Sequence, residues 1–582
     1  MAEPVDRPVR IGNCSGFYGD RLSAMREMLE GGPLDVLTGD YLAELTMLIL
    51  GRDQLKDPSH GYARTFARQL EDCLGLALEK GVRIVSNAGG LNPAGLAARI
   101  REAARGLGLD PAVAYVDGDD VRALGFENAL TANAYLGGSG IAAALSAGAD
   151  VVVTGRVTDA SLVVGPAVWW HGWSQTSYDE LAGAVVAGHV LECGCQATGG
   201  NFSGFFHAIT PHWPHVPLGF PLAEIAADGS SVITKHDATG GLVSVDTVTA
   251  QLMYEIQGPQ YLGPDVTTDL TSIRLARAGS DRVAISGVRG SAPPERLKVG
   301  VNELGGYRNS VEFLLTGLDI DAKAEWVSDQ LRASWGDHPP QTVVWHESPP
   351  PVRDAASMEM AHSVLRCTAQ DPSPDVVGRL FTGAAVELAL SSYPGFTMTA
   401  PPRNATPYGV YRAEYVARSA VTHTVHHADG STSLVEEGAL APVTKPGDLT
   451  ADPVRGFVTG LRPSSTSGVR VPLGTFVHAR SGDKGGDANL GLWVSHDDQD
   501  KYDARVSWLL ELVTTERVQR LLPETQTLDI EIHQLPNLGG VNVVVHGFLG
   551  RGVAASTRID PQAKALGELA RSRFVDIPEP LL

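Results

Sequence analysis

Short apolar segments alternate with helical patterns between Val9 and Val153, and this alternation constrains the fold more than any other feature of the sequence. The apolar segments predict strands at Val9–Cys14, Leu34–Leu37, Val82–Val85, Ala112–Val116 and Asp150–Val153. The intervening segments predict helices, one marked by Leu22, Met25, Met28 and Leu29, and others at Asp40–Leu50, Gly61–Glu79, Pro93–Gly106 and Ser139–Ala147. Because strands that alternate with helices are joined by right-handed crossovers, we expect an α/β fold with a large, mostly parallel sheet flanked by helices.

Small or polar residues follow each of these strands. They are Asn13–Asp20, Thr38–Asp40, Ser86–Gly90, Asp117–Asp120 and Thr154–Asp159. In open parallel sheets, ligands bind beyond the C-terminal ends of the strands. Five polar turns at one edge of the sheet therefore predict a binding pocket there.

The first of these turns combines glycines with the start of a helix. Asp20 is in position to cap that helix. Such a turn points backbone N–H groups at its occupant, which suits a phosphate or carboxylate, and a plain tight turn is an equal alternative. The turn does not carry the dinucleotide-binding fingerprint, because Cys14 stands where the middle glycine is required.

Two of the turns contain charged residues suited to chemistry. Asp40 and Glu44 lie four residues apart on the expected helix, so they could act as paired carboxylates. The alternative is that Asp40 caps the helix and Glu44 is solvated. Arg156 lies in an otherwise apolar run and needs an anionic partner, either Asp159 or a substrate carboxylate or phosphate.

Two further groups of side chains could bind a metal ion. Oxygen ligands suited to Mg²⁺ are offered by Asp117, Asp119 and Asp120, although a solvated turn that caps the next helix is at least as compatible. In the segment Ala187–Asn201, one helical face would carry His189, Glu192 and Cys193. Since no distant His or Cys cluster completes four ligands, we favour a carboxylate held by the glycine turn that follows, and no metal.

The rest of the chain divides into a middle segment and a small C-terminal domain. Arg274–Val301 is predicted to be β structure, and Tyr307–Leu315, Ala322–Trp335 and Asp375–Leu390 are predicted to be helical. Prolines, glycines and serines without periodicity in Val443–Ser467 indicate a linker. We expect an N-terminal domain over 1–455 that is subdivided near 180–340, a linker over 456–468, and a small α+β domain over 469–582.

The C-terminal domain contains the densest group of charges in the chain. His478–Asn489 is predicted to be a polar loop between strands Val471–Val477 and Leu490–Val494. We expect its charged residues to complete, from a second domain or a neighbouring subunit, the site formed by the strand-end turns. The alternative is that Arg480 pairs with Asp483 or Asp487 and only holds the loop rigid.

Composition excludes several classes of protein. The net charge of -21 argues against a nucleic-acid partner, because a phosphate backbone requires a basic face. Five cysteines scattered over 582 residues do not form a disulfide framework, which favours the cytoplasm. We expect no signal peptide, because Met1–Arg10 is polar, and no membrane span, because Arg156 and Asp159 interrupt the most apolar window. A homo-oligomer is compatible with the apolar content but is not required by it.

Five motifs in order resemble those of the acyclic terpene utilisation family, AtuA-like. They are Ile11-Gly12-x3-Gly16-Phe17-x-Gly19-Asp20, Ser86 to Pro93, Thr154-Gly155-Arg156-x2-Asp159-Ala160, Glu192 to Phe202, and Arg480 to Gly485. The resemblance covers nearly the whole chain and implies a long N-terminal domain followed by a small ferredoxin-like domain. It also implies a place in the breakdown of branched isoprenoid acids carried as coenzyme A thioesters, as a lyase or hydratase for a 3-hydroxyacyl or glutaryl-type thioester.

The family pattern assigns no catalytic residue, so candidates come from the chemistry that such a reaction needs. A lyase or hydratase requires a base, an acid and donors to a developing enolate. The base candidates are Asp40, Glu44, Asp159 and Glu192, and the charge stabilisers are Arg156, Arg480 and Lys484. The expected substrate-binding residues are Asn13, Ser15, Gly16, Asp20, Asn87, Gly89, Gly90, Gln196, Thr198, Gly199, Asn201, Asp483, Asp487 and Asn489.

We therefore expect an enzyme for a small acidic or coenzyme A-linked substrate. No cofactor is expected, since coenzyme A enters only as part of the thioester. Two other classes remain open. One is a non-catalytic subunit that organises other enzymes of the pathway, which would place the charged C-terminal loop far from any pocket. The other is a hydrolase that uses a divalent metal at Asp117, Asp119 and Asp120 or at His189 and Glu192.

Overall fold

The computed structural model describes residues 7–208, 216–436 and 468–582, which form two compact units. The larger unit comprises Met1–Asn302, Tyr411–Val553 and Gln562–Leu582, and the smaller comprises Glu303–Val410 and Ala554–Pro561. The smaller unit thus begins at Glu303, a position inside the range 180–340 that the sequence offered for a subdivision. Residues 456–467 of the expected linker lie outside the described residues.

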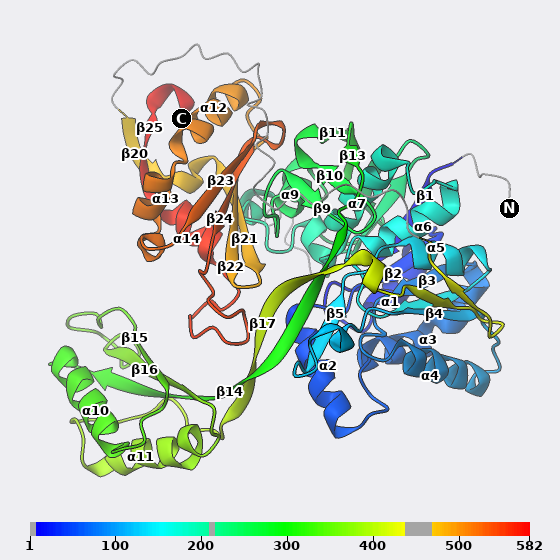
Figure 1. Cartoon of the computed structure of the whole chain (residues 1–582). Helices are drawn as coiled ribbons and strands as arrows, with labels where there is room; N and C mark the ends of the chain where they lie inside the picture. Colours follow the sequence, from blue (N-terminus) through cyan, green and yellow to red (C-terminus); the bar gives the residue numbers. More distant parts are fainter. Residues whose placement is uncertain (1–6, 209–215, 437–467) are drawn as a thin grey trace. The chain divides into compact units, whose positions relative to one another are not determined.

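An 11-stranded sheet organises the larger unit, in the order β11-β12-β8-β7-β1-β2-β3-β6-β4-β18-β19 (Figure 1). The five central strands are parallel, and the strands on either side of them are antiparallel. The α/β class is thereby confirmed. The strands are β1 (Val9–Asn13), β2 (Val36–Gly39), β3 (Arg83–Ser86), β4 (Val113–Asp117), β6 (Val151–Thr154), β7 (Pro221–Ile225), β8 (Ser231–Lys235), β11 (Arg274–Gly279), β12 (Arg282–Ser286), β18 (Thr424–His426) and β19 (Thr432–Leu434).

Helices cover both faces of the parallel part of this sheet (Figure 1). One face carries α1 (Ala24–Gly31), α3 (Arg64–Lys80) and α4 (Pro93–Gly106), and the other carries α5 (Ser139–Ser146), α6 (Ser161–His171) and α7 (Tyr178–Leu191). Sequence signals explain two of these ends. Gly81 ends α3 in the left-handed conformation, and Asn92 caps α4 by accepting a hydrogen bond from Gly95 N at 2.9 Å.

Further elements surround this core and include two more helices, α2 (Glu44–Lys56) and α9 (Val245–Leu252). A three-stranded sheet is formed by β9 (Gln260–Leu262), β10 (Thr267–Asp269) and β13 (Arg289–Ser291). The predicted helix at Tyr307–Leu315 is wrong, because β14 (Arg296–Thr316) runs through it and pairs at its start with β5 (Thr131–Ala134). Val311, Phe313 and Leu315 are buried at every second position, which is the period of a strand.

The smaller unit is a sheet packed against helices. Its strands are ordered β15-β16-β14-β17, with β15 (Thr342–Glu347), β16 (His362–Asp371) and β17 (Thr406–Ala417), and its helices are α10 (Ile320–Ser334) and α11 (Phe381–Glu387). Buried residues such as Phe313, Val327 and Phe381 form its core.

The C-terminal part of the larger unit is a four-stranded sheet covered by helices. The strand order is β21-β22-β24-β23, with β21 (Val477–Lys484), β22 (Asp487–Val494), β23 (Ile530–Leu535) and β24 (Gly540–Val545). The helices are α12 (Tyr502–Leu512), α13 (Thr515–Leu521) and α14 (Leu566–Ser572), and a separate pair is formed by β20 (Gly468–Pro472) and β25 (Phe574–Pro578). The α+β class expected here is confirmed.

The charged segment His478–Asn489 is a hairpin of β21 and β22, so the predicted loop is wrong. Ala479 pairs with Leu492 and Lys484 with Asp487, which leaves only Gly485 and Gly486 in the turn. Gly485 has φ +68°, a conformation that glycine adopts at little cost. Several polar residues of these two strands are buried in contacts with the N-terminal part of the chain.

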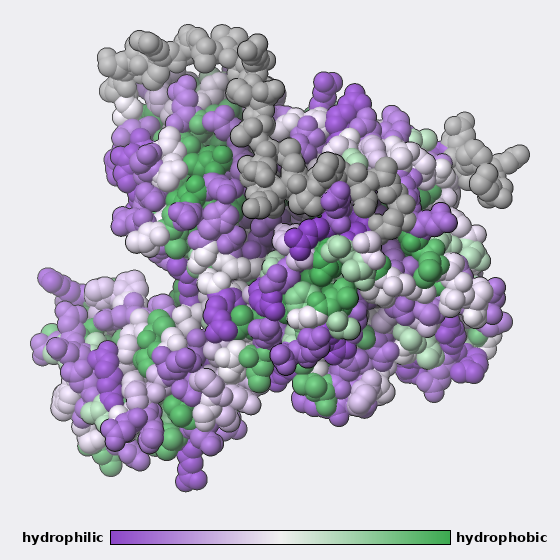
Figure 2. Space-filling model, viewed as in Figure 1, coloured by the Kyte–Doolittle hydropathy of each residue, from purple (hydrophilic) through white to green (hydrophobic). Residues whose placement is uncertain are grey.

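On the face shown in Figure 2, hydrophobic residues form several separate groups among hydrophilic ones. Within the described ranges, no helix combines the length and the apolar character that crossing a bilayer requires.

Close packing at Gly89 generates the first testable prediction. A Cβ at Gly89 would overlap the carbonyl oxygen of Thr154 and lie 2.7 Å from Pro93 Cβ. Gly89→Ala should therefore lower the free energy of unfolding by about 1–3 kcal/mol in urea denaturation. Gly106→Ala, at the end of α4 with no atom within 4 Å of the added Cβ, is the control and should be neutral or stabilising. Equal stability of the two variants would contradict the packing argument.

Candidate active site

A cavity with a volume of about 1480 Å³ opens at the C-terminal edge of the parallel strands. Three of the five strand-end turns line it, through Gly16 and Asp20, Asp40, and Arg156 and Asp159. The third and fourth turns act indirectly, because Asn87 holds Asp40 and Asp119 holds the backbone of Arg156. The five turns therefore lie at one edge of the sheet, as expected.

Asp40 is buried at the cavity wall and is not a helix cap. Helix α2 begins only at Glu44, so Asp40 and Glu44 do not share a helical face as predicted. Asp40 Oδ1 accepts hydrogen bonds from Asn87 Nδ2 at 2.6 Å and Leu42 N at 3.0 Å. Burial, followed by the nearby Asp159 carboxylate, raises the pKa of Asp40 well above its usual range. Asp40 therefore holds a proton more tightly than an exposed carboxyl group does, as a proton donor requires.

Arg156 is the buried cation of the fifth turn. Its guanidinium forms an ion pair with Asp159 (Nη1 to Oδ1, 3.1 Å), donates to Leu42 O at 2.9 Å and stacks 4.2 Å from the centre of the Tyr135 ring. Burial lowers the pKa of Arg156, but Asp159 and other groups raise it above its ordinary value. Of the two partners expected for this arginine, Asp159 is therefore present.

His189 and Glu192 form a buried pair at the end of α7. His189 Nε2 lies 3.0 Å from the carbonyl oxygen of Tyr254, so Nε2 must carry a hydrogen. His189 Nδ1 lies 3.3 Å from Glu192 Oε1. Burial lowers the pKa of His189 but the Glu192 carboxylate raises it further, and burial raises the pKa of Glu192. The pKa of each group is thus raised, and neither His189 Nδ1 nor Glu192 Oε2 has a hydrogen-bond partner in the described structure.

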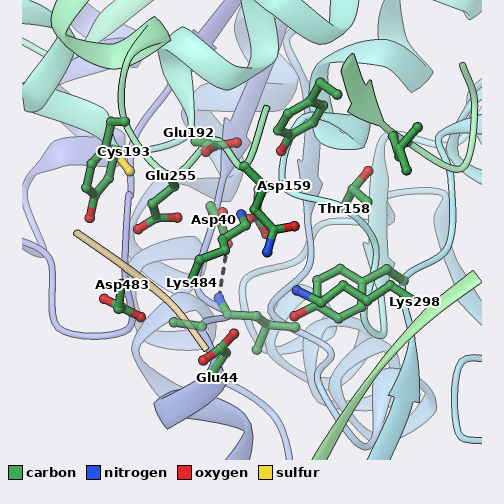
Figure 3. Close-up of a pocket in the computed structure, with 18 of the residues that line it drawn as sticks. Asp40, Glu44, Thr158, Asp159, Glu192, Cys193, Glu255, Lys298, Asp483 and Lys484 are labelled. Atoms are coloured by element: carbon green, nitrogen blue, oxygen red, sulfur yellow. Dashed lines mark hydrogen bonds between the residues drawn. The ribbon is translucent and has the colours of Figure 1, made fainter. Parts of the chain in front are cut away.

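Lys484 enters the cavity from the hairpin turn (Figure 3). Burial lowers the pKa of Lys484, but the Tyr261 phenol and the carboxylates of Glu255, Glu192 and Asp159 raise it above its usual value, so this side chain is an ammonium ion. No ion pair or hydrogen bond joins its Nζ to any described residue. Lys298 Nζ lies 4.9 Å from the centre of the Tyr135 ring and is a second cavity ammonium without an ion pair among the described residues.

Two more acidic side chains face this region of the cavity. Burial raises the pKa of Glu44, although the positive charges of Lys298 and Lys484 lower it in part. Burial, together with the carboxylates of Glu255 and Glu44, raises the pKa of Asp483 to about 8. The cavity therefore combines protonated carboxyls with ammonium groups.

Arg480 joins the C-terminal hairpin to the turn after α7. Its guanidinium donates to Gln196 Oε1 and to Asn201 O, the latter at 3.4 Å, and lies 4.2 Å from the centre of the Tyr254 ring. It forms no ion pair with Asp483 or Asp487, so the rigid-loop alternative does not hold. Asp487 instead accepts from Gly547 N at 2.8 Å and contacts His546.

Many residues expected to bind substrate lie behind the cavity wall. Asn13 Nδ2 donates to Leu191 O at 2.7 Å, and Thr198 Oγ1 donates to Gly219 O at 2.7 Å. Asn489 is buried against Glu255. The expected residues outside the wall are Asn13, Ser15, Asn87, Gly89, Gly90, Thr198, Gly199, Asp487, Asn489 and the stabiliser Arg480, whereas Gly16, Asp20, Gln196, Asn201 and Asp483 line it.

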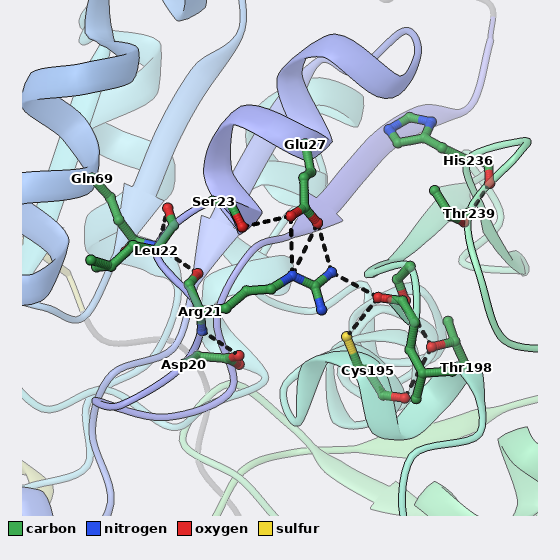
Figure 4. A network of polar contacts seen from close by, with 12 residues as sticks. Asp20, Arg21, Leu22, Ser23, Glu27, Gln69, Cys195, Thr198, His236 and Thr239 are labelled. Atoms are coloured by element: carbon green, nitrogen blue, oxygen red, sulfur yellow. Dashed lines mark hydrogen bonds and ion pairs between the residues drawn. The ribbon is translucent and has the colours of Figure 1, made fainter. Parts of the chain in front are cut away.

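A polar network braces the first turn from behind (Figure 4). Arg21 pairs with Glu27 at 2.6 Å and donates to Leu218 O at 2.7 Å. Asp20 does not cap α1, whose N-cap is Ser23; it accepts from Gly16 N at 3.0 Å and closes the turn on itself. This turn is therefore built by its own contacts.

The side chains considered for a metal site serve other contacts. Asp117 pairs with His426 at 3.0 Å and Asp120 with Arg122 at 2.6 Å, while Asp119 accepts from Arg156 N at 2.8 Å. Across the described residues, no group of three or more His, Cys, Asp or Glu side chains is arranged to hold a metal ion.

Sequence reasoning missed several residues of the cavity wall. Glu255, Lys298, Tyr135 and Tyr261 belong to no strand-end turn and to no charged motif. Side chains along β14 point alternately to its two faces, and Lys298 lies on the face toward the cavity. This alternation could have been applied to Lys298 once Arg274–Val301 was predicted to be β structure. No sequence signal distinguishes Glu255.

Asp119 provides a prediction on pH. Burial raises its pKa from 3.8 to about 7, so the folded protein keeps a proton that the unfolded chain loses. The free energy of unfolding should fall as the pH rises through that window, by up to roughly 1.4 kcal/mol per pH unit. Asp119→Asn should remove this share of the slope in urea unfolding, whereas the exposed control Asp120→Asn should not. If the free energy of unfolding of the wild type and of Asp119→Asn had the same dependence on pH, the raised pKa of Asp119 would be contradicted.

Arg480 provides a prediction on stability. Arg480→Ala removes its hydrogen bonds to Gln196 and Asn201 and its contact with Tyr254, so the free energy of unfolding should fall by about 2–4 kcal/mol. Arg470→Ala, on the exposed face of β20, should change it by less than about 0.5 kcal/mol. Calorimetric unfolding of both variants tests this, and equal midpoints would refute a structural role for Arg480.

Two protein-family models match this chain. No curated protein and no solved structure was found to match. Residues 471–575 match the AtuA ferredoxin-like domain, which contains the hairpin that carries Arg480 and Lys484. Residues 9–427 match the acyclic terpene utilisation family protein AtuA. The chain therefore belongs to the AtuA family, whose role is in acyclic terpene utilisation.

Proposed function

We propose that this protein is a lyase of the hydratase type that acts on a branched or isoprenoid acyl-CoA thioester by acid–base catalysis. The observation that carries the proposal is the Lys484 ammonium, which lies in the cavity among acidic groups without a direct partner in the described residues. Such a cation is suited to a developing anion on the substrate. Membership of the AtuA family supports a substrate of the isoprenoid type.

The reaction needs a base for the substrate proton. Beside a protonated His189, Glu192 is a carboxylate and its free Oε2 removes the proton from Cα of a 3-hydroxyacyl thioester. The electrons move into the thioester carbonyl, whose oxygen becomes an enolate oxygen. Lys484 and Arg156 provide positive charge for it.

The reaction also needs an acid for the leaving hydroxyl. Asp40 keeps its proton because it is buried beside Asp159, and it passes this proton to the hydroxyl as the Cβ–O bond breaks. The products are an α,β-unsaturated thioester and water, and solvent returns the proton from Glu192 to Asp40. The reverse sequence of steps is hydration.

A non-catalytic organising subunit is less compatible with this geometry. It would place the charged C-terminal segment away from any pocket, but Asp483 and Lys484 line the cavity. Acid–base catalysis gives those two residues a chemical role.

Turnover of a branched 3-hydroxyacyl-CoA tests the proposal, with the α,β-unsaturated thioester followed by its absorbance. Glu192→Gln and Asp40→Asn should each lower kcat about 10²- to 10⁴-fold. Lys484→Met should lower it by a similar factor, because the enolate loses its cation. Glu511→Gln, on exposed α12, is the matched control and should retain wild-type kcat.

Calorimetric titration with the same thioester provides the binding measurement. Absence of binding by the wild type, or unchanged turnover in the Glu192, Asp40 and Lys484 variants, would overturn the proposed function.

A further inference from the structure

Glu255 has an unusual backbone conformation at the wall of the cavity. Its φ is +56°, in the left-handed region, which is unfavourable for a residue that carries a Cβ. It lies three residues after the end of α9, in the segment Tyr254–Ile256. Strain of this kind persists only where surrounding contacts impose it, and such positions are concentrated at functional sites.

Two buried asparagines of the C-terminal sheet impose this conformation. Asn489 Oδ1 on β22 accepts a hydrogen bond from Glu255 N at 2.8 Å. Asn542 Nδ2 on β24 donates to Ile256 O at 3.1 Å. The two asparagine side chains are joined by a hydrogen bond from Asn489 Nδ2 to Asn542 Oδ1. We call Asn489 and Asn542 the amide clip, because together they fix the backbone on both sides of the Glu255 side chain.

The C-terminal sheet is also shaped to receive this segment. A Cβ at Gly491 would lie 2.6 Å from Met253 Cβ, and a Cβ at Gly482 would overlap the Tyr254 ring. The absence of side chains at these two strand positions lets the segment approach the sheet closely. The amide clip is thus part of a fitted surface.

A purely structural role for the amide clip does not explain why residue 255 carries a carboxylate side chain. Glycine would adopt the same φ without strain. The Glu255 carboxylate lines the cavity near Lys484 and Cys193 and forms no hydrogen bond or ion pair with any described residue (Figure 3). A carboxylate can only accept hydrogen bonds, so its natural partner is an O–H or N–H group of a ligand.

We propose that Glu255 is a further catalytic residue, which accepts a hydrogen bond from the substrate hydroxyl and orients it for protonation by Asp40. Asn489 and Asn542 are positioning residues that act through Glu255. The inference rests on the proposed function and makes it more specific, because it requires a hydroxylated acyl thioester as the ligand. It also gives the C-terminal domain a second role, which is to set the conformation of a residue of the N-terminal part.

Unfolding measurements test the strain without any substrate. Glu255→Gly should unfold at a higher temperature than Glu255→Ala, because only glycine adopts φ +56° freely. The difference should shrink when Asn489→Ala is added, since the amide clip is then broken. At the exposed helical position Glu511, the order should be reversed, with Ala more stable than Gly. If the thermal unfolding midpoint of Glu255→Ala were equal to or higher than that of Glu255→Gly, the inference that residue 255 is strained would be wrong.

Binding measurements test the role of the carboxylate. In calorimetry the wild type should bind a branched 3-hydroxyacyl-CoA about 10- to 100-fold more tightly than the same thioester without the hydroxyl. Glu255→Gly, which keeps the fold, should bind the two equally. If the wild type shows the preference and Glu255→Gly keeps it, the role of Glu255 is refuted while the proposed function stands. If the wild type binds neither thioester, the proposed function and the hydroxyl role both fail, and the unfolding experiment still decides on the amide clip.

Discussion

The hydrogen bonds of Arg480 with Gln196 and Asn201 are the contact on which the candidate site depends. They join β21 to the turn that follows α7, although these segments lie far apart in the sequence. The buried guanidinium donates to both partners through its two Nη groups, and this holds the two segments in one geometry. Through this contact the hairpin carries Lys484 into a cavity that the N-terminal strands open.

The chemistry of the cavity follows from burial more than from any single motif. Asp40, Glu44 and Asp483 line the same cavity, and removal from water favours their protonated forms. The Glu192 carboxylate raises the pKa of the neighbouring His189, and burial raises the pKa of Glu192 itself. A protein with a net charge of -21 can therefore present a cavity whose fixed charges are partly neutralised. This reconciles an acidic chain with a proposed anionic thioester.

Local patterns predicted the parallel core well. Pro93, Gly81 and the amphipathic period placed α3 and α4 within a few residues, because these signals act within one turn of helix. The pattern failed in β14, where a short stretch compatible with a helix belongs to a strand that pairs with β16. It also failed in the hairpin, where the polar residues Arg480, Ser481 and Asn489 are buried in contacts with segments distant in the sequence.

The candidate site was predictable to the extent that topology dictates it. Parallel strands bring Asp40, Arg156 and Asp159 to one edge whatever the rest of the chain does. Glu255 could not be found in this way, since its orientation depends on two amides more than two hundred residues later. Asn87 and Asp119 were correctly placed at the edge, but their side chains hold other groups and do not face the cavity.

The pairing of Arg480 with Gln196 has a consequence for how such a chain can change over time. A substitution of Gln196 leaves the buried Arg480 without one of its acceptors, and a substitution of Arg480 leaves Gln196 without this donor, so a change at one position is felt at the other. Acceptable exchanges should arise in both together. A chimera that takes the N-terminal part and the ferredoxin-like domain from different lineages should therefore lose this contact unless both residues of the pair are carried over together.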